Sequence, residues 1–438
     1  MSDGWFKTTV GEYSPFVYGK AIKKDDQRTM GIPVYGSNGI YTYSDSALVQ
    51  QHAVIIGRKG SVGKVHLSTE KCWISDTAFY VIKDSLDESY FVYYLLSSLG
   101  LENMNTDAAV PGLNRDNAHR LEIKIPNSIE KRINLVEPLI KLDQKIHLNN
   151  QINQTLESIA QALFKSWFVD FEPVRAKIVA KQEGNDPELA AMCVISGKSE
   201  VELHQMAEDD FAELQATAAL FPDEFVESEL GEVPKGWTLT LLKDVTTELR
   251  RGISPKYTEE PNGAIVINQK CIRNHTINFS LARKHDSSKR KIDGRELQIG
   301  DVLVNSTGVG TLGRIASVRY LDSITVVDSH VTVVRANDKK VSRAYLQGLL
   351  LENEKFIEAS GAGTTGQTEL RKEVLQDIKF PNPAVALHQQ FDSIIYKINQ
   401  EIANLEKMNI SLSHVRNTLL PKLLSGELDM LLLRQEGA

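Results

Sequence analysis

Residues 301–314 read Asp-Val-Leu-Val-Asn-Ser-Thr-Gly-Val-Gly-Thr-Leu-Gly-Arg, and an earlier stretch of the chain matches them. Residues 52–65 read His-Ala-Val-Ile-Ile-Gly-Arg-Lys-Gly-Ser-Val-Gly-Lys-Val. Each consists of an apolar strand, a glycine turn, a basic residue and the start of another strand. The turn positions that match are Gly60 with Gly310, Gly63 with Gly313, and Lys64 with Arg314. The sequence therefore predicts two copies of one structural unit.

The repetition extends outward from these two turns. Each unit ends in a strand that is stopped by a proline, which continues neither a β-ladder nor a helix. The copies differ most in residues 11–47 and 246–291, and we expect these stretches to carry different specificities. The further matching pairs are Gly4-Trp5 with Gly236-Trp237, the Tyr- and Leu-rich stretch 90–99 with 345–351, and the final strand 121–126 with 376–381.

After each final proline the apolar period changes from about two to about three and a half, which indicates a switch from sheet to a long helix. A continuous helix over residues 391–423 would be about 50 Å long at roughly 1.5 Å per residue. Its heptad-like stripe is interrupted by Asn409, a polar residue of the kind that fixes the register of paired helices. We expect the two helices to pair through apolar residues at helical spacing: Ile140, Leu156, Leu163, Ile398, Ile402, Leu405, Leu412 and Leu419.

The sequence thus predicts an α+β architecture. Two similar, mixed or mainly β recognition domains alternate with two long helices that pair as an antiparallel coiled coil, giving approximate internal twofold symmetry. We expect both helical regions to act as spacers. The expected segments are a first recognition domain at 1–128, a first helical region at 129–180, an acidic helical insertion at 181–232, a second recognition domain at 233–382 and a second helical region at 383–438.

The net charge of −7 is unevenly distributed along the chain. Residues 180–232 hold 2 Lys and Arg against 14 Asp and Glu, whereas residues 235–380 hold 23 against 17. The acidity therefore belongs to the insertion, and the second domain keeps a positive balance that suits nucleic acid.

The scattered cysteines and the lack of long apolar runs exclude other classes of protein. Cys72, Cys193 and Cys271 favour reduced, buried thiols over a disulfide framework or a paired-cysteine zinc site. No apolar run approaches the roughly 18 residues that cross a bilayer, and the first ten residues have no signal-peptide pattern. We expect a cytoplasmic chain that does not enter a membrane.

Two glycine-rich strings resemble nucleotide-binding motifs only by their letters. Residues 308–313 fit a dinucleotide fingerprint, but the residues that follow, 314–320, read as a strand and not as the helix that would hold a pyrophosphate. Residues 57–64 resemble a phosphate-binding P-loop, yet Val65 stands where a magnesium-binding hydroxyl is required. The histidines offer no pair at metal-ligand spacing, and no nucleophile stands beside a base. We expect no catalytic residue, metal or cofactor in this chain.

Nucleic-acid binding is the function that the turns favour. Asn or Gln can read adenine, Arg or Lys can read guanine, and backbone N–H groups with cations hold phosphates. The alternative is that these are ordinary loop residues and that the glycines serve turn geometry alone. The basic run at 283–291 is either a phosphate contact or solvated surface. The candidates are Tyr35, Ser37, Asn38, Arg58, Lys59, Ser61 and Lys64 in the first unit, and Asn268, Gln269, Lys270, Arg273, Asn274, Thr307, Thr311 and Arg314 in the second.

The repeats, the paired helices and the string Ser-Glu-Leu-Gly-Glu-Val-Pro-Lys-Gly-Trp at 228–237 together resemble the specificity subunits of type I restriction-modification enzymes. The resemblance spans nearly the whole chain. Further strings that look like those of the family are Phe-Val-Asp-Phe-Glu-Pro-Val-Arg at 168–175, Asp-Val-Leu-Val-Asn-Ser-Thr-Gly-Val-Gly-Thr-Leu-Gly-Arg at 301–314 and Leu-Leu-Pro-Lys-Leu-Leu-Ser-Gly-Glu at 419–427.

The resemblance implies a non-catalytic subunit that reads double-stranded DNA. Each recognition domain would read one half of an asymmetric, bipartite site, and the helices would set the gap. The family also implies two modification subunits that methylate adenine N6 with S-adenosylmethionine, and motor-nuclease subunits that cleave with ATP and Mg²⁺. Two alternatives stay open: a self-contained DNA-modifying enzyme with an unrecognised site, and a coiled-coil scaffold for proteins alone.

Overall fold

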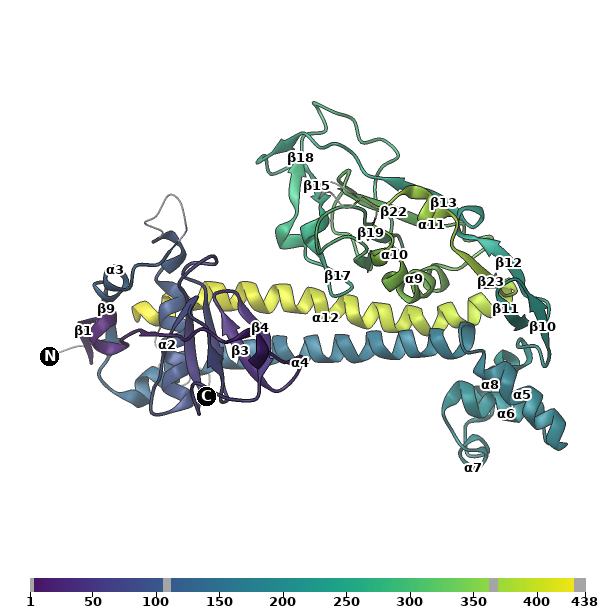
Figure 1. The fold of residues 1–438 in the computed structure, drawn as a ribbon, viewed down its shortest axis with the longest axis horizontal. Helices are drawn as coiled ribbons and strands as arrows, with labels where there is room; N and C mark the ends of the chain where they lie inside the picture. The colour runs from purple at the N-terminus through teal and green to yellow at the C-terminus, as the bar shows by residue number, and fades with distance from the viewer. Residues whose placement is uncertain (1–3, 105–111, 362–368, 429–438) are drawn as a thin grey trace. The chain divides into compact units, whose positions relative to one another are not determined.

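The computed structural model describes residues 4–104, 112–361 and 369–428 and divides into two compact units. Unit 1 comprises Met1–Asn150 with Lys407–Ala438, and unit 2 comprises Gln151–Glu406. Each unit contains a β domain and parts of two long helices, α4 (Ile129–Phe168) and α12 (Val385–Ser425). Figure 1 labels these elements along the chain.

The first β domain contains three sheets, ordered β2-β8-β5-β6, β4-β3-β7 and β1-β9. All neighbours are antiparallel except β3 and β7, which run parallel. Its strands are β1 (Trp5–Thr9), β2 (Val17–Tyr18), β3 (Ile32–Gly36), β4 (Gly39–Ser44), β5 (Ala53–Gly57), β6 (Val65–Ser68), β7 (Trp73–Ile74), β8 (Ala78–Val81) and β9 (Glu122–Pro126).

The second β domain is ordered β13-β22-β19-β20, β14-β18-β15-β21 and β12-β23, with a small hairpin β16-β17. Its one parallel pair among the described strands is β15 with β21. Its strands are β12 (Thr238–Leu241), β13 (Thr246–Arg251), β14 (Tyr257–Thr258), β15 (Ala264–Ile267), β16 (Ile272–Arg273), β17 (Thr276–Ile277), β18 (Arg283–His285), β19 (Val302–Asn305), β20 (Ile315–Ser317), β21 (Thr325–Val327), β22 (Val331–Ala336) and β23 (Lys379–Asn382).

The two β domains share one topology. The order β2-β8-β5-β6 matches β13-β22-β19-β20, the parallel pair β3-β7 matches β15-β21, and the closing pair β1-β9 matches β12-β23. The added parts of the second domain are β14 and the hairpin β16-β17. The duplication that the two glycine turns predict is confirmed strand by strand.

Both cores are built around the strand that precedes the glycine turn. In β5 every residue is buried, with Val54 and Ile56 in the main core and Ile55 in a smaller core against β7. In β19, Val304 likewise lies in the main core and Leu303 in a smaller core. Because both faces are covered, these strands read as continuous apolar runs rather than as an alternating pattern. Burying each such side chain contributes about 1.5–3 kcal/mol.

One helix covers the main core in each domain: α2 (Leu86–Ser98) in the first and α9 (Arg343–Glu352) in the second. Both begin at a serine, Ser85 or Ser342, whose hydroxyl accepts a hydrogen bond from a backbone N–H of the first turn. Such caps stabilise a helix by about 1 kcal/mol. Shorter helices follow: η2 (Leu101–Asn103) and α3 (Arg115–His119) in the first domain, α10 (Glu354–Ala359) and α11 (Lys372–Gln376) in the second.

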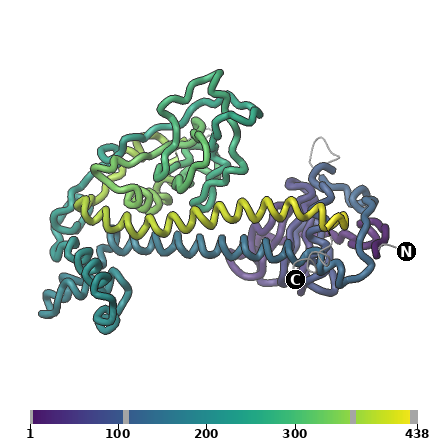
Figure 2. Tube along the Cα trace, turned by 180° about the vertical axis from the view of Figure 1, so that it is seen from behind, coloured from purple at the N-terminus to yellow at the C-terminus, as the bar shows by residue number. Residues whose placement is uncertain are grey.

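Helices α4 and α12 run side by side and antiparallel within each unit (Figures 1 and 2). In unit 1, Asp143 pairs with Arg416 and Asn149 with Asn409. In unit 2, the rings of Phe164 and Phe391 meet at 6.0 Å. The expected pairing residues are all buried or half-buried: Ile140, Leu156, Leu163, Ile398, Ile402, Leu405, Leu412 and Leu419.

The register residue Asn409 has the polar partners that its position in the stripe predicts. Its Oδ1 accepts from Asn149 Nδ2 at 2.8 Å, and its Nδ2 donates to Asn150 Oδ1 at 2.9 Å. Asn149 is fully buried, so a shift of one helix along the other would leave buried amides without partners. The same stripes also contain Ile152, Ile159 and Val415, which are exposed.

The acidic insertion folds into short helices rather than one long helix. They are α5 (Glu172–Glu183), α6 (Pro187–Ser196), α7 (Glu200–Leu203) and α8 (Glu208–Ala219), followed by the hairpin β10 (Phe225–Ser228) and β11 (Gly231–Pro234). Gly197 ends α6 with a φ of 69°, so the helical insertion is divided into separate short helices. The insertion has a small core around Met192 and Leu203, and its Phe221 packs on Trp167 of α4. Among the described residues, no helix is both long enough and apolar enough to span a bilayer.

Candidate nucleic-acid interface

Three connections between strands meet in the first β domain: β3–β4, β5–β6 and β7–β8. Ser37 N donates to Thr77 Oγ1 at 3.3 Å, Lys64 Nζ donates to Asn38 Oδ1 at 2.7 Å, and Arg58 Nη1 donates to the carbonyl of Asp76 at 3.2 Å. The structure therefore brings together Ser37, Asn38, Arg58 and Lys64 from stretches that are separate in the sequence. Lys59 and Ser61 lie in the same β5–β6 turn, and Lys59 is exposed.

Tyr35 is placed differently from its neighbours Ser37 and Asn38. It is half-buried in β3 and packs against the small core around Ile55 and Cys72. Burial raises the pKa of its phenol, while a hydrogen bond with Ser68 opposes that shift. Burial also raises the pKa of the Cys72 thiol to about 11. Tyr35 therefore supports the hairpin from inside, whereas Asn38 lies exposed at its tip.

The equivalent connections meet in the second β domain, with different side chains. Thr307 Oγ1 donates to Gln269 Oε1 at 3.1 Å and also lies 2.8 Å from His330 Nδ1. Asn305 Nδ2 donates to the carbonyl of Gln269 at 3.0 Å. Thr311 Oγ1 donates back to the carbonyl of Thr307 at 3.2 Å, and Arg314 Nη2 to that of Gly310 at 2.6 Å.

A longer segment replaces the tight Ser37-Asn38 turn between β15 and β18. It holds η4 (Gln269–Cys271), the hairpin β16-β17 and η5 (Phe279–Leu281). Asn268 caps η4, because its Oδ1 accepts from Lys270 N at 2.9 Å. Lys270 and Arg273 are exposed on this segment. The candidates of both sequence copies thus lie on equivalent connections.

Close packing explains one pair of the matching glycines. A Cβ at Gly63 would lie 2.2 Å from the backbone N of Glu102, and one at Gly313 would lie 2.8 Å from the Cα of Glu358. Both residues also have positive φ, 72° and 83°. Glycine is therefore required at these positions for packing. At Gly310, by contrast, a Cβ would meet nothing within 4 Å, and its φ of 72° is what favours glycine there.

Sequence reasoning missed a cluster of cations on an exposed tyrosine. The guanidinium groups of Arg58 and Arg115 lie 4.9 and 5.2 Å from the ring centroid of Tyr18, which is 45% exposed. In the second domain Arg283 lies 3.4 Å from the ring of Tyr257. A cation over a ring gains about 0.5–1 kcal/mol at exposed sites. Tyr18 and Arg115 carry no local motif, so only the fold reveals them.

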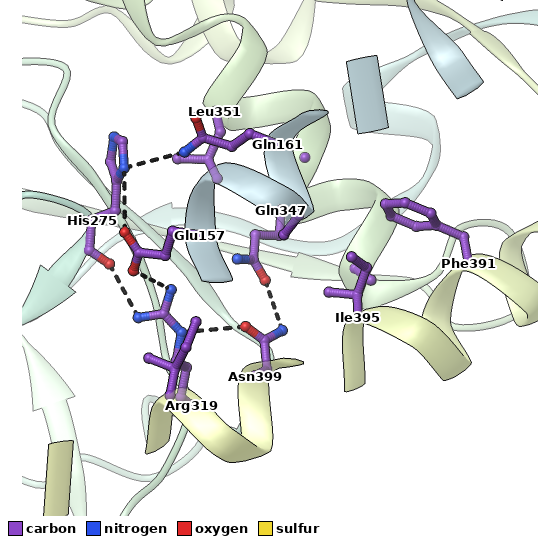
Figure 3. Close-up of a pocket in the computed structure, with 13 residues that line it drawn as sticks. Glu157, Gln161, His275, Arg319, Gln347, Leu351, Phe391, Ile395 and Asn399 are labelled. Carbon is purple, nitrogen blue, oxygen red and sulfur yellow. Dashed lines mark hydrogen bonds and ion pairs between the residues drawn. The ribbon is translucent and has the colours of Figure 1, made fainter. Parts of the chain in front are cut away.

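The tip of the β16-β17 hairpin is held by the helical part of unit 2 (Figure 3). Asn274 and His275 both have positive φ, 50° and 57°, a conformation that costs a non-glycine residue about 1 kcal/mol or more. His275 Nε2 lies 2.8 Å from Glu354 Oε2, and its Nδ1 lies 3.4 Å from Gln161 Nε2 of α4. The hydrogen bond with Glu354 raises the pKa of His275, although burial opposes it.

Arg319 is the centre of this buried cluster. Its side chain is 4% exposed, and its Nη2 donates to Glu157 Oε1 of α4 at 2.8 Å. It also donates to Asn399 of α12 at 3.3 Å and to the carbonyl of His275 at 3.5 Å. Glu406 lies 3.5 Å away, and burial raises the pKa of this carboxyl. Figure 3 shows Arg319, Glu157, Asn399 and His275 at the pocket that Phe391, Ile395 and Leu351 also line.

Among residues 4–104, 112–361 and 369–428, no group of three or more His, Cys, Asp or Glu side chains is placed to hold a metal ion. The described part of the molecule offers instead two equivalent surfaces of amides, hydroxyls and cations. These groups are suited to reading base edges and to contacting phosphates.

Comparison with known proteins agrees with the duplication. The model of the type I restriction modification DNA specificity domain matches residues 2–158 and again residues 234–412. The specificity subunit of the type I restriction enzyme HindI from Haemophilus influenzae is 31% identical over 342 residues, which cover 73% of this chain and 71% of that one. The specificity subunit of type I restriction enzyme MjaIX from Methanocaldococcus jannaschii is 23% identical over 352 residues, covering 78% and 69%.

A solved structure shows the same fold over nearly the whole chain. The S subunit of a type I restriction-modification system from M. genitalium superposes with a TM-score of 0.51 at 13% identity, and the match covers 96% of each chain. Duplicated domain, paired helices and sequence relatives lead to one conclusion. The chain belongs to the family of type I restriction-modification specificity subunits.

Proposed function

We propose that this chain reads an asymmetric, bipartite site in double-stranded DNA, one half with each β domain. The supporting observation is that the same three connections meet in both domains while their side chains differ. A shared framework with different surface groups suits two readers of unlike half-sites. Asn38 with Lys64, and Gln269 with Lys270 and Arg273, are the groups that we assign to the base edges.

The paired helices α4 and α12 set the gap between the half-sites in this proposal. Each is continuous through both units, and the Asn149–Asn409 pair opposes sliding of one along the other. Because DNA presents the same face about every 10 base pairs, a change in helix length changes the spacing that can be read. Matched deletions of seven residues from both helices should therefore alter the recognised gap. An unchanged gap would contradict the spacer role.

The chain itself performs no catalysis in this proposal and acts in the cytoplasm as a scaffold. Two modification subunits bind S-adenosylmethionine and methylate adenine, and motor-nuclease subunits use ATP and Mg²⁺ to cleave. Turnover by the purified chain alone would instead indicate a self-contained enzyme. Failure to retain DNA even with the other subunits present would indicate a protein scaffold.

Sequencing of methylated adenines in cells with and without the chain tests the proposal directly. We expect a two-part motif that disappears with the chain. Substituting Asn38 and Lys64 with Ala should change one half of the motif, and substituting Lys270 and Arg273 should change the other. If either pair altered both halves or neither, the assignment of one reader to each half would be wrong.

A further inference from the structure

A cationic cleft opens in the second β domain beside the β19–β20 turn. It is a hollow of about 490 Å³ lined by Arg250, Arg251, Arg371 and Lys372 together with Glu369 and Glu373, and its remaining lining residues are Thr332, Leu370 and Leu375. Arg251 Nη1 forms an ion pair with Glu369 Oε1 at 2.6 Å, and Arg251 Nη2 donates to the carbonyl of Leu370 at 2.9 Å. Among the described residues, Arg371 and Lys372 have no side-chain hydrogen bond or ion pair.

The position of Arg371 is unusual for its local structure. It is the N-cap of α11, where its side chain makes no capping hydrogen bond. The equivalent residue in the first domain, Asn114, accepts hydrogen bonds from Asp116 N at 2.9 Å and from Asn117 N at 3.1 Å. Asn is among the best N-caps, and its loss costs about 0.5–2 kcal/mol. An arginine here gives up local stability and adds a cation to the cleft.

In each domain, the turn after the buried strand meets the start of a short helix, α3 or α11, and we call this place the junction. The junction is cationic in the first domain too. The bridge Lys59↔Gly112 corresponds to Thr307↔Glu369, so Asn114 and Arg115 correspond to Arg371 and Lys372. The register places Tyr18 opposite Phe79 and Arg251 opposite Thr332, at equivalent positions of β2 and β13. Arg58 and Arg115 gather on Tyr18 where Arg251, Arg371 and Lys372 gather in the second domain. Two different sets of side chains thus place positive charge at one point of the shared fold.

We propose that this junction binds a backbone phosphodiester of the DNA in each domain: through Arg371 and Lys372 in the second, and through Arg58 and Arg115 in the first. This inference rests on the proposed DNA reading and deepens it. The junction adjoins the β5–β6 and β19–β20 turns. These turns contact the groups that we assign to the base edges, through Lys64 with Asn38 and through Thr307 with Gln269. Phosphate contacts fix the register of a domain on the duplex but carry no sequence information, so these cations position the reader while the neighbouring connections specify the sequence.

The test measures the salt dependence of binding by the full chain, purified with its other subunits, to a fluorescein-labelled duplex of random sequence. Each neutralised phosphate contributes about 0.9 to the slope of log K against log salt. Because Arg371 and Lys372 together contact one phosphate, Arg371→Ala/Lys372→Ala should lower the slope by about 0.9. Between 50 and 200 mM KCl, the affinity advantage of the wild type should shrink by roughly 3.5-fold. The methylation motif should stay unchanged.

Two matched variants separate the cleft from fold and from net charge. Arg371→Lys/Lys372→Arg keeps both cations and should keep the wild-type slope. Lys198→Ala/Lys339→Ala removes two exposed cations elsewhere in unit 2 and should leave the slope unchanged. An unchanged slope in the Arg371→Ala/Lys372→Ala variant, or an equal loss in the Lys198→Ala/Lys339→Ala control, would overturn the cleft assignment alone.

Two further results show whether the cleft binds free phosphate or DNA, and whether this inference fails alone or together with the proposed DNA reading. If millimolar inorganic phosphate at constant ionic strength displaced the duplex, the cleft would be a site for free anions and the assignment to DNA would be wrong. If the wild type bound no duplex at any salt concentration, the proposed DNA reading would fail together with this inference.

Discussion

The first and second β domains differ where they are exposed and agree where they are buried. Their strands pair in one order, and the strand before the glycine turn is buried in both. Between β3 and β4, however, the first domain has the two-residue turn Ser37-Asn38, whereas residues 268–282 fill the equivalent place in the second. The same buried core therefore tolerates very different connections between its strands. Recognition can therefore change without a change of fold.

The domains also differ in how they attach to the helical part of their own unit. In unit 1, Asp143 of α4 accepts from Tyr94 Oη at 2.6 Å and from Arg416 Nη1 of α12 at 2.5 Å. The Asp143 and Arg416 side chains are each 27% exposed, whereas the Arg319 side chain in unit 2 is 4% exposed. Attachment in unit 2 therefore depends more strongly on buried charge.

The largest expected effect comes from Arg319→Met. Removing this guanidinium leaves Glu157 and Glu406 without their counter-charge in a buried place, which destabilises by about 3–5 kcal/mol. Arg416→Met in unit 1 should cost about 1 kcal/mol or less, because water screens its partner. Chemical denaturation, with hydrogen exchange of residues 271–278, measures both. Equal losses would remove the proposed contrast between the units.

The next effect tests the equivalence of the two domains. A Cβ at Gly19 would lie 2.0 Å from the carbonyl oxygen of Ser75, and one at Gly252 would lie 2.0 Å from that of Val327. Gly19→Ala and Gly252→Ala should each destabilise by about 1–3 kcal/mol or more, since backbone must move. Gly36→Ala, which meets the movable ring of Tyr41 at 3.1 Å, is the control. The domains would not be equivalent here if only one variant lost stability.

A smaller effect of opposite sign is expected at the start of α11. Arg371→Asn supplies the missing cap and should raise stability by about 1 kcal/mol while weakening DNA binding. Asn114→Arg in the first domain should lower stability by a similar amount. Thermal unfolding and duplex titration on the same samples measure the two changes. A gain of stability without loss of binding would argue against a phosphate contact at Arg371.

The smallest effect is a difference in pH dependence. Burial lowers the pKa of His66 beside the first turn, with Lys64 acting in the same direction and the backbone of Ser37 opposing it. The unfolded chain then takes up the proton first, so unit 1 should lose stability as pH falls below 6.5. His275 faces Glu354, Glu157, Gln161 and Arg319, and its pKa is raised by Glu354. The stability that protonated His275 adds to unit 2 is fully present below pH 6.5 and is lost as the pH rises through the pKa of His275 in the folded state.

Unfolding curves of His66→Gln and His275→Gln between pH 5 and pH 8 test this contrast. Each variant should remove the contribution of its own histidine to the pH dependence of one unit and leave the pH dependence of the other unit unchanged. If both variants changed the profile on the same side of pH 6.5, the two histidines would not titrate as described.

Buried patterns made the framework predictable from the sequence. The apolar runs before the glycine turns predict β5 and β19. Pro126 ends β9, and Pro381 lies one residue before the end of β23, so a proline marks the close of each domain because it cannot donate to a β-ladder. The apolar stripe that Asn409 interrupts predicts the helix pair, because its residues recur at the period of a helix. Gly308 to Gly313 lead into strand β20, as expected, and not into a helix.

The site was less predictable because its groups meet only through the fold. Asn38 and Lys64 lie in separate connections, and no spacing in the sequence relates Tyr18 to Arg115. The hairpin β16-β17 lies in a stretch without a matching copy, and its turn uses Asn274 and His275 where glycine would be the usual signal. The sequence predicts a helical insertion, but a single glycine such as Gly197 is a weak signal for the point where one short helix ends.

One further consequence follows from the closing strand pairs β1-β9 and β12-β23. Trp5 lies opposite Pro126, and Thr238 lies opposite Asn382, so the chain enters and leaves each β domain at the same point. A domain built this way behaves as an interchangeable cassette, because a homologous segment with the same two ends can be exchanged without rerouting the backbone. Under the proposed function, recombination at these borders would create a new target from two old ones in a single genetic event.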